Sequence, residues 1–352
     1  MFLDDMLDER KKRILRAIID DYIGTAEPVG SRTIARKHEL GLSSATIRNE
    51  MADLEEMGFL AQPHSSAGRV PSDKGYRLYV DHLMELNELP VEDIEGIKSA
   101  MEVKINELSQ LIRQASMVMS RITRYTSLAT TPQLKKSTFK AVQVVPIETG
   151  KALVIVVTDA GVVRNCLIRI PDAILPDFLI KVSNLLNEKL VGLTLGQVDR
   201  KVVGEIQDEI IITKELLMPI LKGIAECISQ IDSHEVFLDG TTNIFNYPEF
   251  RDIIKAKEFL SFLDQKEILC GLLESNLPND SVVVKIGAEN CVDGIKECSL
   301  VKATYSLGDV VIGSIGVIGP TRMEYPRVIS SMNYIKKKIN QELKKLVEGN
   351  TE

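Results

Sequence analysis

The chain has 352 residues, of which 44% are apolar and 26% are charged, and this length predicts two or three domains that can each bury a core. No apolar run is long enough for a membrane helix, and the acidic, polar N-terminus lacks the pattern of a secretory signal, so we expect a cytoplasmic protein without a membrane partner. The net charge of -7 excludes a general basic excess. Salt screens charges within about 10 Å, so a surface that binds an anionic partner would need only a local basic cluster.

Short helical patterns occupy the start of the chain. Apolar residues recur there at three- and four-residue spacing, and small polar residues precede two of the patterns as candidate caps. The expected helices span 14–23, 32–38 and 44–57, with Ser31 and Ser43 as caps and Gly24, Gly41 and Gly58 at the ends and turns.

A hairpin pattern follows the third helix. Residues 59–62 form a strand candidate, 63–68 a polar turn, and 69–70 a return strand before Pro71. Three helices and a hairpin in this order are the plan of a winged helix-turn-helix. The alternative is a plain helical module, since two short helices joined by a glycine turn occur in many proteins.

The third helix has two chemically different faces. Ile47 and Met51 lie on the side expected to face the core, whereas Ala45 and Asn49 lie on the opposite side. Small outward side chains allow close approach to base edges, Asn49 suits adenine, and Arg48 suits guanine or a phosphate. The helix is therefore a candidate reader of the major groove.

Polar residues of the helices, the hairpin and the segment after it complete the predicted DNA-binding surface. Charge does not decide the question, because residues 28–77 hold seven Lys or Arg and six Asp or Glu. The predicted contacts are Ser31, Ser43, Ser44, Ala45, Thr46, Arg48, Asn49, Gln62, His64, Ser65, Ser66, Arg69, Lys74, Tyr76 and Arg77.

A long amphipathic pattern runs from Val91 to Arg124. Its apolar residues average 3.5 residues per step, which is the period of a coiled-coil seam. The alternative is one amphipathic helix packed on the sheet of its own domain. We favour this alternative, because few charge pairs flank the seam.

The second half of the chain alternates between strands and helices. A hairpin is expected over 139–147 and 152–157, and further strands over 162–170, 282–286, 299–305 and 310–318, with a mostly helical stretch over 171–230. Gly313, Gly316 and Gly319 lie inside an apolar strand and indicate close packing, not a phosphate loop. Lys336, Lys337 and Lys338 are interpreted as a solvated helix face.

No enzyme motif stands out. The four histidines do not pair with cysteines or acids at metal-ligand spacing, and no nucleophile elbow or P-loop occurs. Five scattered cysteines fit free thiols in a reducing compartment. We predict neither catalysis nor a metal or cofactor.

Several long motifs resemble the HrcA family of heat-inducible repressors of bacterial chaperone operons. The motifs are LSSATIRNEM at 42–51, QPHSSAGRVP at 62–71, DKGYR at 73–77, VFLDGTTN at 236–243 and IGVIGPTRM at 315–323. The resemblance covers essentially the full length. Ser72 and Phe59 depart mildly from the expected threonine and tyrosine.

The resemblance implies an α+β multidomain architecture. A winged helix at 1–87 precedes a GAF-like α/β domain at 88–170 and 245–352, interrupted at 171–244 by a mostly helical dimerisation domain with a small antiparallel sheet. It also implies a homodimer that binds an inverted-repeat operator in double-stranded DNA upstream of chaperone (groE, dnaK) operons, with the chaperonin GroEL keeping the repressor active. Two other hypotheses stay open, namely a regulator that senses a small molecule and a scaffold that does not bind DNA.

Overall fold

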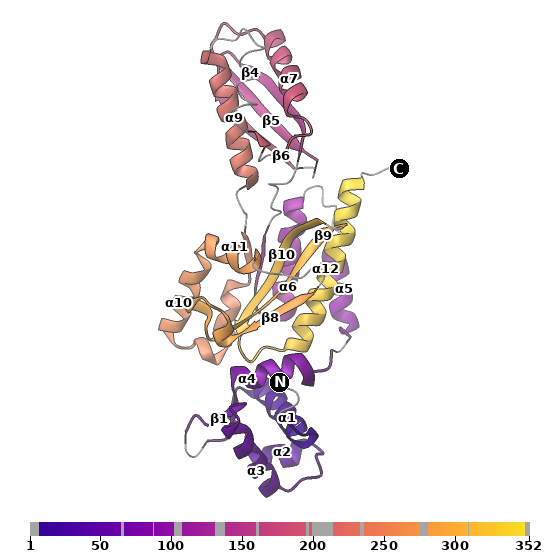
Figure 1. Ribbon diagram of the computed structural model, residues 1–352, viewed down its shortest axis with the longest axis vertical. Helices are drawn as coiled ribbons and strands as arrows, with labels where there is room; N and C mark the ends of the chain where they lie inside the picture. The colour runs from indigo at the N-terminus through magenta and orange to yellow at the C-terminus, as the bar shows by residue number, and fades with distance from the viewer. Residues whose placement is uncertain are drawn as a thin grey trace.

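A computed structural model describes residues 7–64, 67–86, 88–101, 108–130, 138–159, 162–194, 197–198, 214–232, 236–274, 281–308 and 310–348. Three parts follow one another along the long axis of the molecule (Figure 1). We call them the N-terminal unit, the central domain and the inserted unit. Helices and antiparallel sheets occur together, so the predicted α+β class is confirmed.

The N-terminal unit contains three helices followed by a two-stranded antiparallel hairpin, in the predicted order. Its elements are α1 (Glu9–Thr25), α2 (Ser31–Lys37), α3 (Ser44–Glu56), β1 (Leu60–Ala61) and β2 (Val70–Pro71). Ser43 caps α3 as predicted, because its hydroxyl accepts the N–H of Thr46 at 3.1 Å. Ser31 is instead the first residue of α2, and Gly30 occupies the cap position.

A short helix leads out of the hairpin. It consists of α4 (Asp73–Leu78) and a π-helical turn, η2 (Tyr79–Leu83). Ser72 caps α4 by accepting the N–H of Gly75 at 3.1 Å. This helix lies between the hairpin and the central domain (Figure 1).

The central domain is built on a five-stranded antiparallel sheet in the order β7-β3-β10-β9-β8. Its strands are β3 (Thr126–Thr130), β7 (Val236–Asp239), β8 (Val282–Ile286), β9 (Cys298–Leu307) and β10 (Val310–Pro320). The three strands predicted after residue 280 are confirmed as β8, β9 and β10. The sequence patterns did not predict β3 and β7.

Helices cover both faces of this sheet. On one face lie α6 (Leu108–Thr123) and α12 (Tyr325–Glu348). The other face carries α10 (Ile253–Leu263), α11 (Lys266–Glu274) and the short turns η5 (Thr241–Asn246), η6 (Pro248–Phe250) and η8 (Asp293–Ile295), while η7 (Gly287–Glu289) follows β8. Gly316 lies where a Cβ would approach a Leu273 methyl group to 2.8 Å, which supports the close-packing interpretation of the strand glycines.

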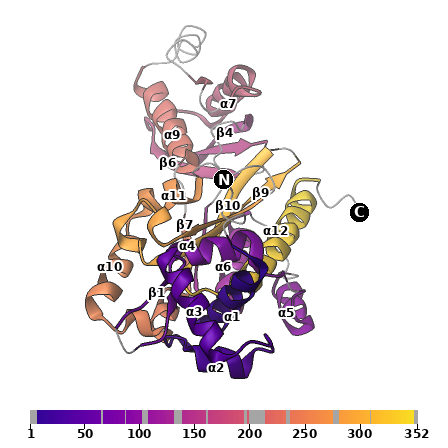
Figure 2. The same ribbon diagram turned by 60° about the horizontal axis from the view of Figure 1, so that its bottom comes forward.

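The amphipathic pattern after residue 90 forms two helices that fold against each other, so a single continuous helix is wrong. Gln114 of α6 donates to the carbonyl of Ala100 in α5 (Val91–Met101) at 3.0 Å. Fourteen positions along one helix would span about 21 Å, so these residues could not meet in it. α6 packs on the sheet of its own domain as expected, and α5 lies beside α12 (Figures 1 and 2).

The inserted unit has a core of its own. An antiparallel sheet in the order β4-β5-β6 packs one face against two helices. Its elements are β4 (Phe139–Glu148), β5 (Lys151–Thr158), β6 (Val163–Arg169), α7 (Pro176–Leu190) and α9 (Lys214–Asp232).

The expected domain division needs a correction at this unit. The prediction assigned residues 139–170 to the domain formed by 88–170 and 245–352, and it began the inserted domain at 171. In the structure, these strands share a buried cluster with α7 and α9 and do not join the central sheet. Strand periodicity predicts that strands form but not which sheet they join.

Candidate DNA-binding interface

The third helix presents the two faces that its sequence predicts. Ile47, Met51 and Leu54 are buried, whereas Arg48 and Asn49 are exposed. Neither Arg48 nor Asn49 has a hydrogen-bond or ion-pair partner among the residues that the structure describes. Both side chains are therefore free to bind a ligand from solvent. Ala45 is also exposed, and Ser44 is half-buried beside it.

A cleft runs between the start of α2, α3 and the hairpin. It brings together four of the predicted contacts, Ser31, Arg48, Gln62 and Arg69, and its remaining lining residues are Gly30, Met51, Ala67 and Gly68. Three separate segments thus converge on one concave polar surface. This arrangement places the hairpin beside the candidate reading helix.

The hairpin is held in place by backbone pairing. Val29, just before α2, exchanges two hydrogen bonds of 2.9 Å with Arg69. A Cβ on Gly68 would lie 2.4 Å from the carbonyl oxygen of Val29, so glycine permits this close approach. The Gln62 amide donates to the carbonyl of Ala67 at 3.1 Å inside the hairpin.

The Arg69 side chain also has a structural partner. Its guanidinium forms an ion pair with Glu55 of α3 at 2.8 Å. The pair joins the hairpin to the helix, so any contact of Arg69 with a phosphate would compete with Glu55.

Hydroxyl groups at the start of α3 serve the helix cap. Ser43 and Thr46 approach to 2.9 Å through their hydroxyl oxygens, while Ser43 also caps the backbone. His64 is exposed at the hairpin tip. Ser65 and Ser66 lie outside the described residues.

Basic residues of α1 neutralise the acidic side of α3. Arg10 and Lys11 reach the buried carboxylate of Glu50 at 2.7 and 2.8 Å, and Lys11 also lies 3.1 Å from Asp53. The hydrogen bonds that the Lys11 ammonium donates to Glu50 and then to Asp53 raise the pKa of Lys11 above its usual value. The sequence analysis missed this role, although the basic run at 10–13 was a visible signal.

Three predicted contacts with DNA are corrected by the structure. Lys74 donates to the carbonyl of Met57 at 2.9 Å and lies over the Phe59 ring. Tyr76 is only 1% exposed, so it cannot touch a phosphate from this position. Arg77 is bound to Glu289 of the central domain, with Nε 2.8 Å from a carboxylate oxygen. All three hold α4 in place.

The lysines of α12 lie in the central domain. Lys336 is 6% exposed, which corrects its interpretation as part of a solvated face, whereas Lys337 is exposed as predicted. Lys338 pairs with Glu342 at 3.4 Å.

Metal-binding groups and membrane spans were sought in the same ranges of the chain. The described residues contain no cluster of three or more His, Cys, Asp or Glu that could hold a metal ion. None of the described helices is both long enough and apolar enough to cross a membrane.

Comparison with known proteins defines the class. A relative from Ruminiclostridium cellulolyticum is 61% identical over 98% of this chain and 99% of its own length, and one from Acetivibrio thermocellus is 58% identical over 97% of both. Both are described as heat-inducible transcription repressors. The class is therefore that of transcription repressors and not of enzymes.

The family follows from a second comparison. Residues 109–329 match the model of the HrcA protein C-terminal domain, and the chain belongs to the HrcA family. A crystal structure described as that of a hypothetical protein is 22% identical, covers 96% of this chain and 98% of its own, and has a TM-score of 0.67. That likeness supports the fold alone.

The buried carboxylate of Glu50 yields a prediction on stability. Glu50→Gln removes the charge that holds Arg10 and Lys11, and we expect α1 and α3 to lose about 2 kcal/mol of stability. Asp53→Asn, at a more exposed position, should cost less than about 1 kcal/mol. Native-state hydrogen exchange of the α1 and α3 amides measures both changes, and equal losses would contradict the assignment.

Proposed function

We propose that this repressor binds an inverted-repeat operator upstream of chaperone (groE, dnaK) operons and thereby restrains the heat-shock response. The N-terminal unit acts as a winged helix, with α3 as the reading helix and the hairpin as the wing. The single observation that carries the proposal is the exposed, unpartnered pair of Arg48 and Asn49 beside the cleft that the wing borders.

The proposed base contacts come from α3. Asn49 suits the bidentate pattern of adenine, and Arg48 that of guanine. The side chain of Ala45 on the outward face is small, so the helix can approach the base edges closely. The remaining proposed contacts bind the phosphate backbone of the DNA and so position the protein on it. They are Ser31, Ser43, Ser44, Thr46, Gln62, His64 and Arg69.

The net charge of the chain does not oppose this function. Three acids of α3, namely Glu50, Asp53 and Glu55, are paired with basic residues of α1 and the wing. The phosphate backbone would therefore meet a helix whose acidic groups are largely compensated, and whose reading face carries the free guanidinium of Arg48.

A homodimer fits the open face of the inserted unit. The β4-β5-β6 sheet has helices on one face, and most of the alternate side chains of the other face are apolar and partly exposed, although Gln143 and Asn165 also lie there. The apolar ones are Ala141, Val145, Leu153, Ile155, Val157, Val163 and Leu167. A second copy would cover this face and place two reading helices on the two half-sites.

We further propose that the central domain is GAF-like, that the protein is cytoplasmic and that GroEL maintains its activity. An apolar surface on α10 supports the contact with a chaperonin, since Ile253 and Ile254 are 82% and 69% exposed. The proposed boundaries are an N-terminal winged helix to about residue 87 and an inserted unit that begins before β4.

Asn49 tests the assignment of the reading surface. Asn49→Ala should weaken operator binding by about 1–3 kcal/mol and relax the preference at one base position, because a bidentate contact is lost. Lys337→Ala is the matched control and should leave both the affinity and its salt dependence unchanged. Titrations of operator duplexes at several salt concentrations measure these effects. Wild-type affinity and base preference in the Asn49 variant would exclude this surface.

The open sheet face tests the dimer. Leu153→Asp places a charge at the proposed contact and should weaken dimerisation at least about a hundredfold, because burial in the interface would remove the hydration of the carboxylate. Lys181→Glu, on the exposed side of α7, is the control and should stay dimeric. Sedimentation equilibrium reports the association state, and an unchanged dimer in the Leu153 variant would contradict the proposal.

The α10 surface tests the chaperonin contact. Purified repressor should bind operator more fully after incubation with GroEL, with no added metabolite. The double variant Ile253→Ser and Ile254→Ser should keep basal binding and lose the stimulation, since the apolar contact is removed. Operator titrations with and without GroEL decide the matter. A requirement for a metabolite in place of GroEL would favour a small-molecule sensor instead.

A further inference from the structure

Two arginines connect the N-terminal unit to the central domain, and both lie away from the reading face of α3. Arg77 belongs to the N-terminal unit and reaches into the central domain. Arg322 belongs to the central domain and reaches back. Each binds at least one carboxylate and one backbone carbonyl, so the contacts fix the orientation of the guanidinium as well as its position.

Arg77 forms four hydrogen bonds to three groups. It binds both carboxylate oxygens of Glu289, donates to the carbonyl of Val284 at 2.7 Å, and lies 3.1 Å from Asp81 on its own helix. A bidentate pair with an added carbonyl bond leaves the guanidinium plane little freedom. The contact therefore sets the angle of α4 against β8 and the turn that follows it.

A second contact holds the first residue of α4. The N–H of Ala288 donates to the carboxylate of Asp73 at 2.9 Å. The neighbouring Gly287 has a φ of +53°, and a Cβ there would lie 2.0 Å from an Asp73 oxygen. Only glycine allows the turn and the start of α4 to approach this closely.

Arg322 holds the other side of the N-terminal unit. It binds the carboxylate of Glu249 and donates to the carbonyl of Ile23, near the end of α1, at 3.0 Å. The carbonyls in the last turn of a helix attract a cation. The end of α1 and the whole of α4 are thus attached at two separated points, which resists rotation.

Buried aromatic rings fill the space between the two arginines. Tyr76 of α4 and Tyr325 at the start of α12 are both buried, with ring centroids 6.0 Å apart. One continuous buried cluster runs from α1 through these rings to α12. The N-terminal unit therefore packs on the central domain as on a core, which a flexible tether would not do.

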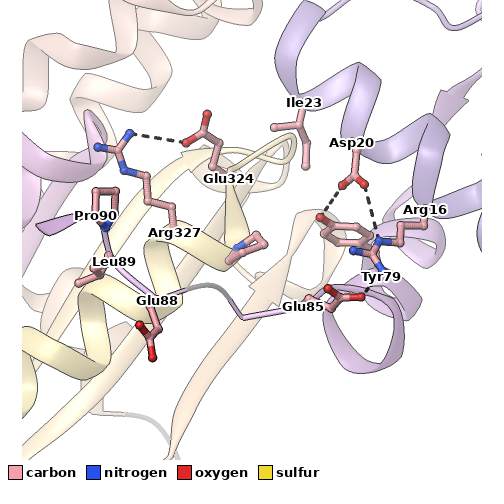
Figure 3. A pocket seen from close by; sticks show the side chains of 11 residues that line it. Arg16, Asp20, Ile23, Tyr79, Glu85, Glu88, Leu89, Pro90, Glu324 and Arg327 are labelled. Carbon is pink, nitrogen blue, oxygen red and sulfur yellow. Dashed lines mark hydrogen bonds and ion pairs between the residues drawn. The ribbon is translucent and has the colours of Figure 1, made fainter. Parts of the chain in front are cut away.

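Side-chain contacts also hold the segment that connects the two parts, and Figure 3 shows those at its first end. Arg16 of α1 binds Glu85 at 2.7 Å, and Tyr79 donates to Asp20 at 2.7 Å on one wall of an interdomain cleft. On the other wall, Arg327 of α12 lies 3.1 Å from Asp93, at the start of α5. The segment that joins the two parts is thus anchored before and after it crosses between them.

These contacts leave the candidate reading surface uncovered. α2 and α3 lie at the far end of the molecule, and α4 lies between them and the central sheet (Figure 1). We propose that Arg77 and Arg322 are positioning residues, which fix the orientation of the reading helix relative to the central domain and so set the half-site spacing that the dimer accepts. This proposal rests on the function proposed above.

The geometry of DNA makes such a constraint measurable. Adding one base pair between half-sites moves the second site by about 3.4 Å and rotates it by about 34°. A rigidly held pair of reading helices cannot follow that rotation without strain, whereas loosely held helices can. Loosening also lowers the effective concentration of the second helix at its half-site.

The experiment uses the full-length chain with duplexes derived from the promoter of the host's chaperone operon. One series carries base pairs added or removed between half-sites, and one duplex carries a single half-site. Arg77→Gln and Arg322→Gln should weaken binding at the best spacing by about tenfold, flatten the dependence on spacing, and leave single half-site binding nearly unchanged. Arg121→Gln, an exposed arginine outside the interface, is the control.

A charge exchange separates positioning from misfolding. Arg77→Glu alone should behave like Arg77→Gln, and Arg77→Glu combined with Glu289→Arg should restore part of the spacing preference. A spacing profile as steep as that of the wild type in Arg77→Gln and Arg322→Gln overturns the proposal, and so does tighter operator binding, which would indicate an inhibitory contact. If the wild type binds no inverted repeat, the proposed function itself fails, and the positioning role fails with it.

Discussion

The contact between Tyr76 and Tyr325 is the constraint on which the arrangement of the chain depends. It joins α4, which follows the hairpin, to α12, which packs on the central sheet, and both rings are buried. Apolar packing does not by itself fix the orientation of two parts. The hydrogen bonds of Arg77 and Arg322, which lie on either side of this contact, fix one orientation. The position of α3 relative to the rest of the molecule follows from that orientation.

Local charge compensation would allow this acidic protein to present the proposed reading helix to DNA. Glu50 is buried among Arg10 and Lys11, and Glu55 is bound by Arg69. These pairs act within a few ångströms, whereas the net charge of -7 is spread over the whole chain and is screened by salt. Arg48 remains free on the reading face, so the local field and the bulk charge can differ in sign.

Sequence patterns predicted what depends on near neighbours. The cap at Ser43, the turn at Gly41 and the outward position of Asn49 follow from residues three or four apart. The patterns failed for Arg77, because its partner Glu289 is 212 positions away and nothing local distinguishes an interdomain arginine from one that binds phosphate. The helical pattern after residue 90 had the right period, but periodicity does not reveal that α5 folds back on α6.

The attachment of the inserted unit has a consequence for the central sheet. Thr130 at the end of β3 and Val236 at the start of β7 are register partners in neighbouring strands. The chain therefore leaves the sheet and returns to it at one place, and the hydrogen bonds between β3 and β7 do not pass through the inserted unit. A rotation of the unit as a body would therefore break none of the hydrogen bonds between β3 and β7.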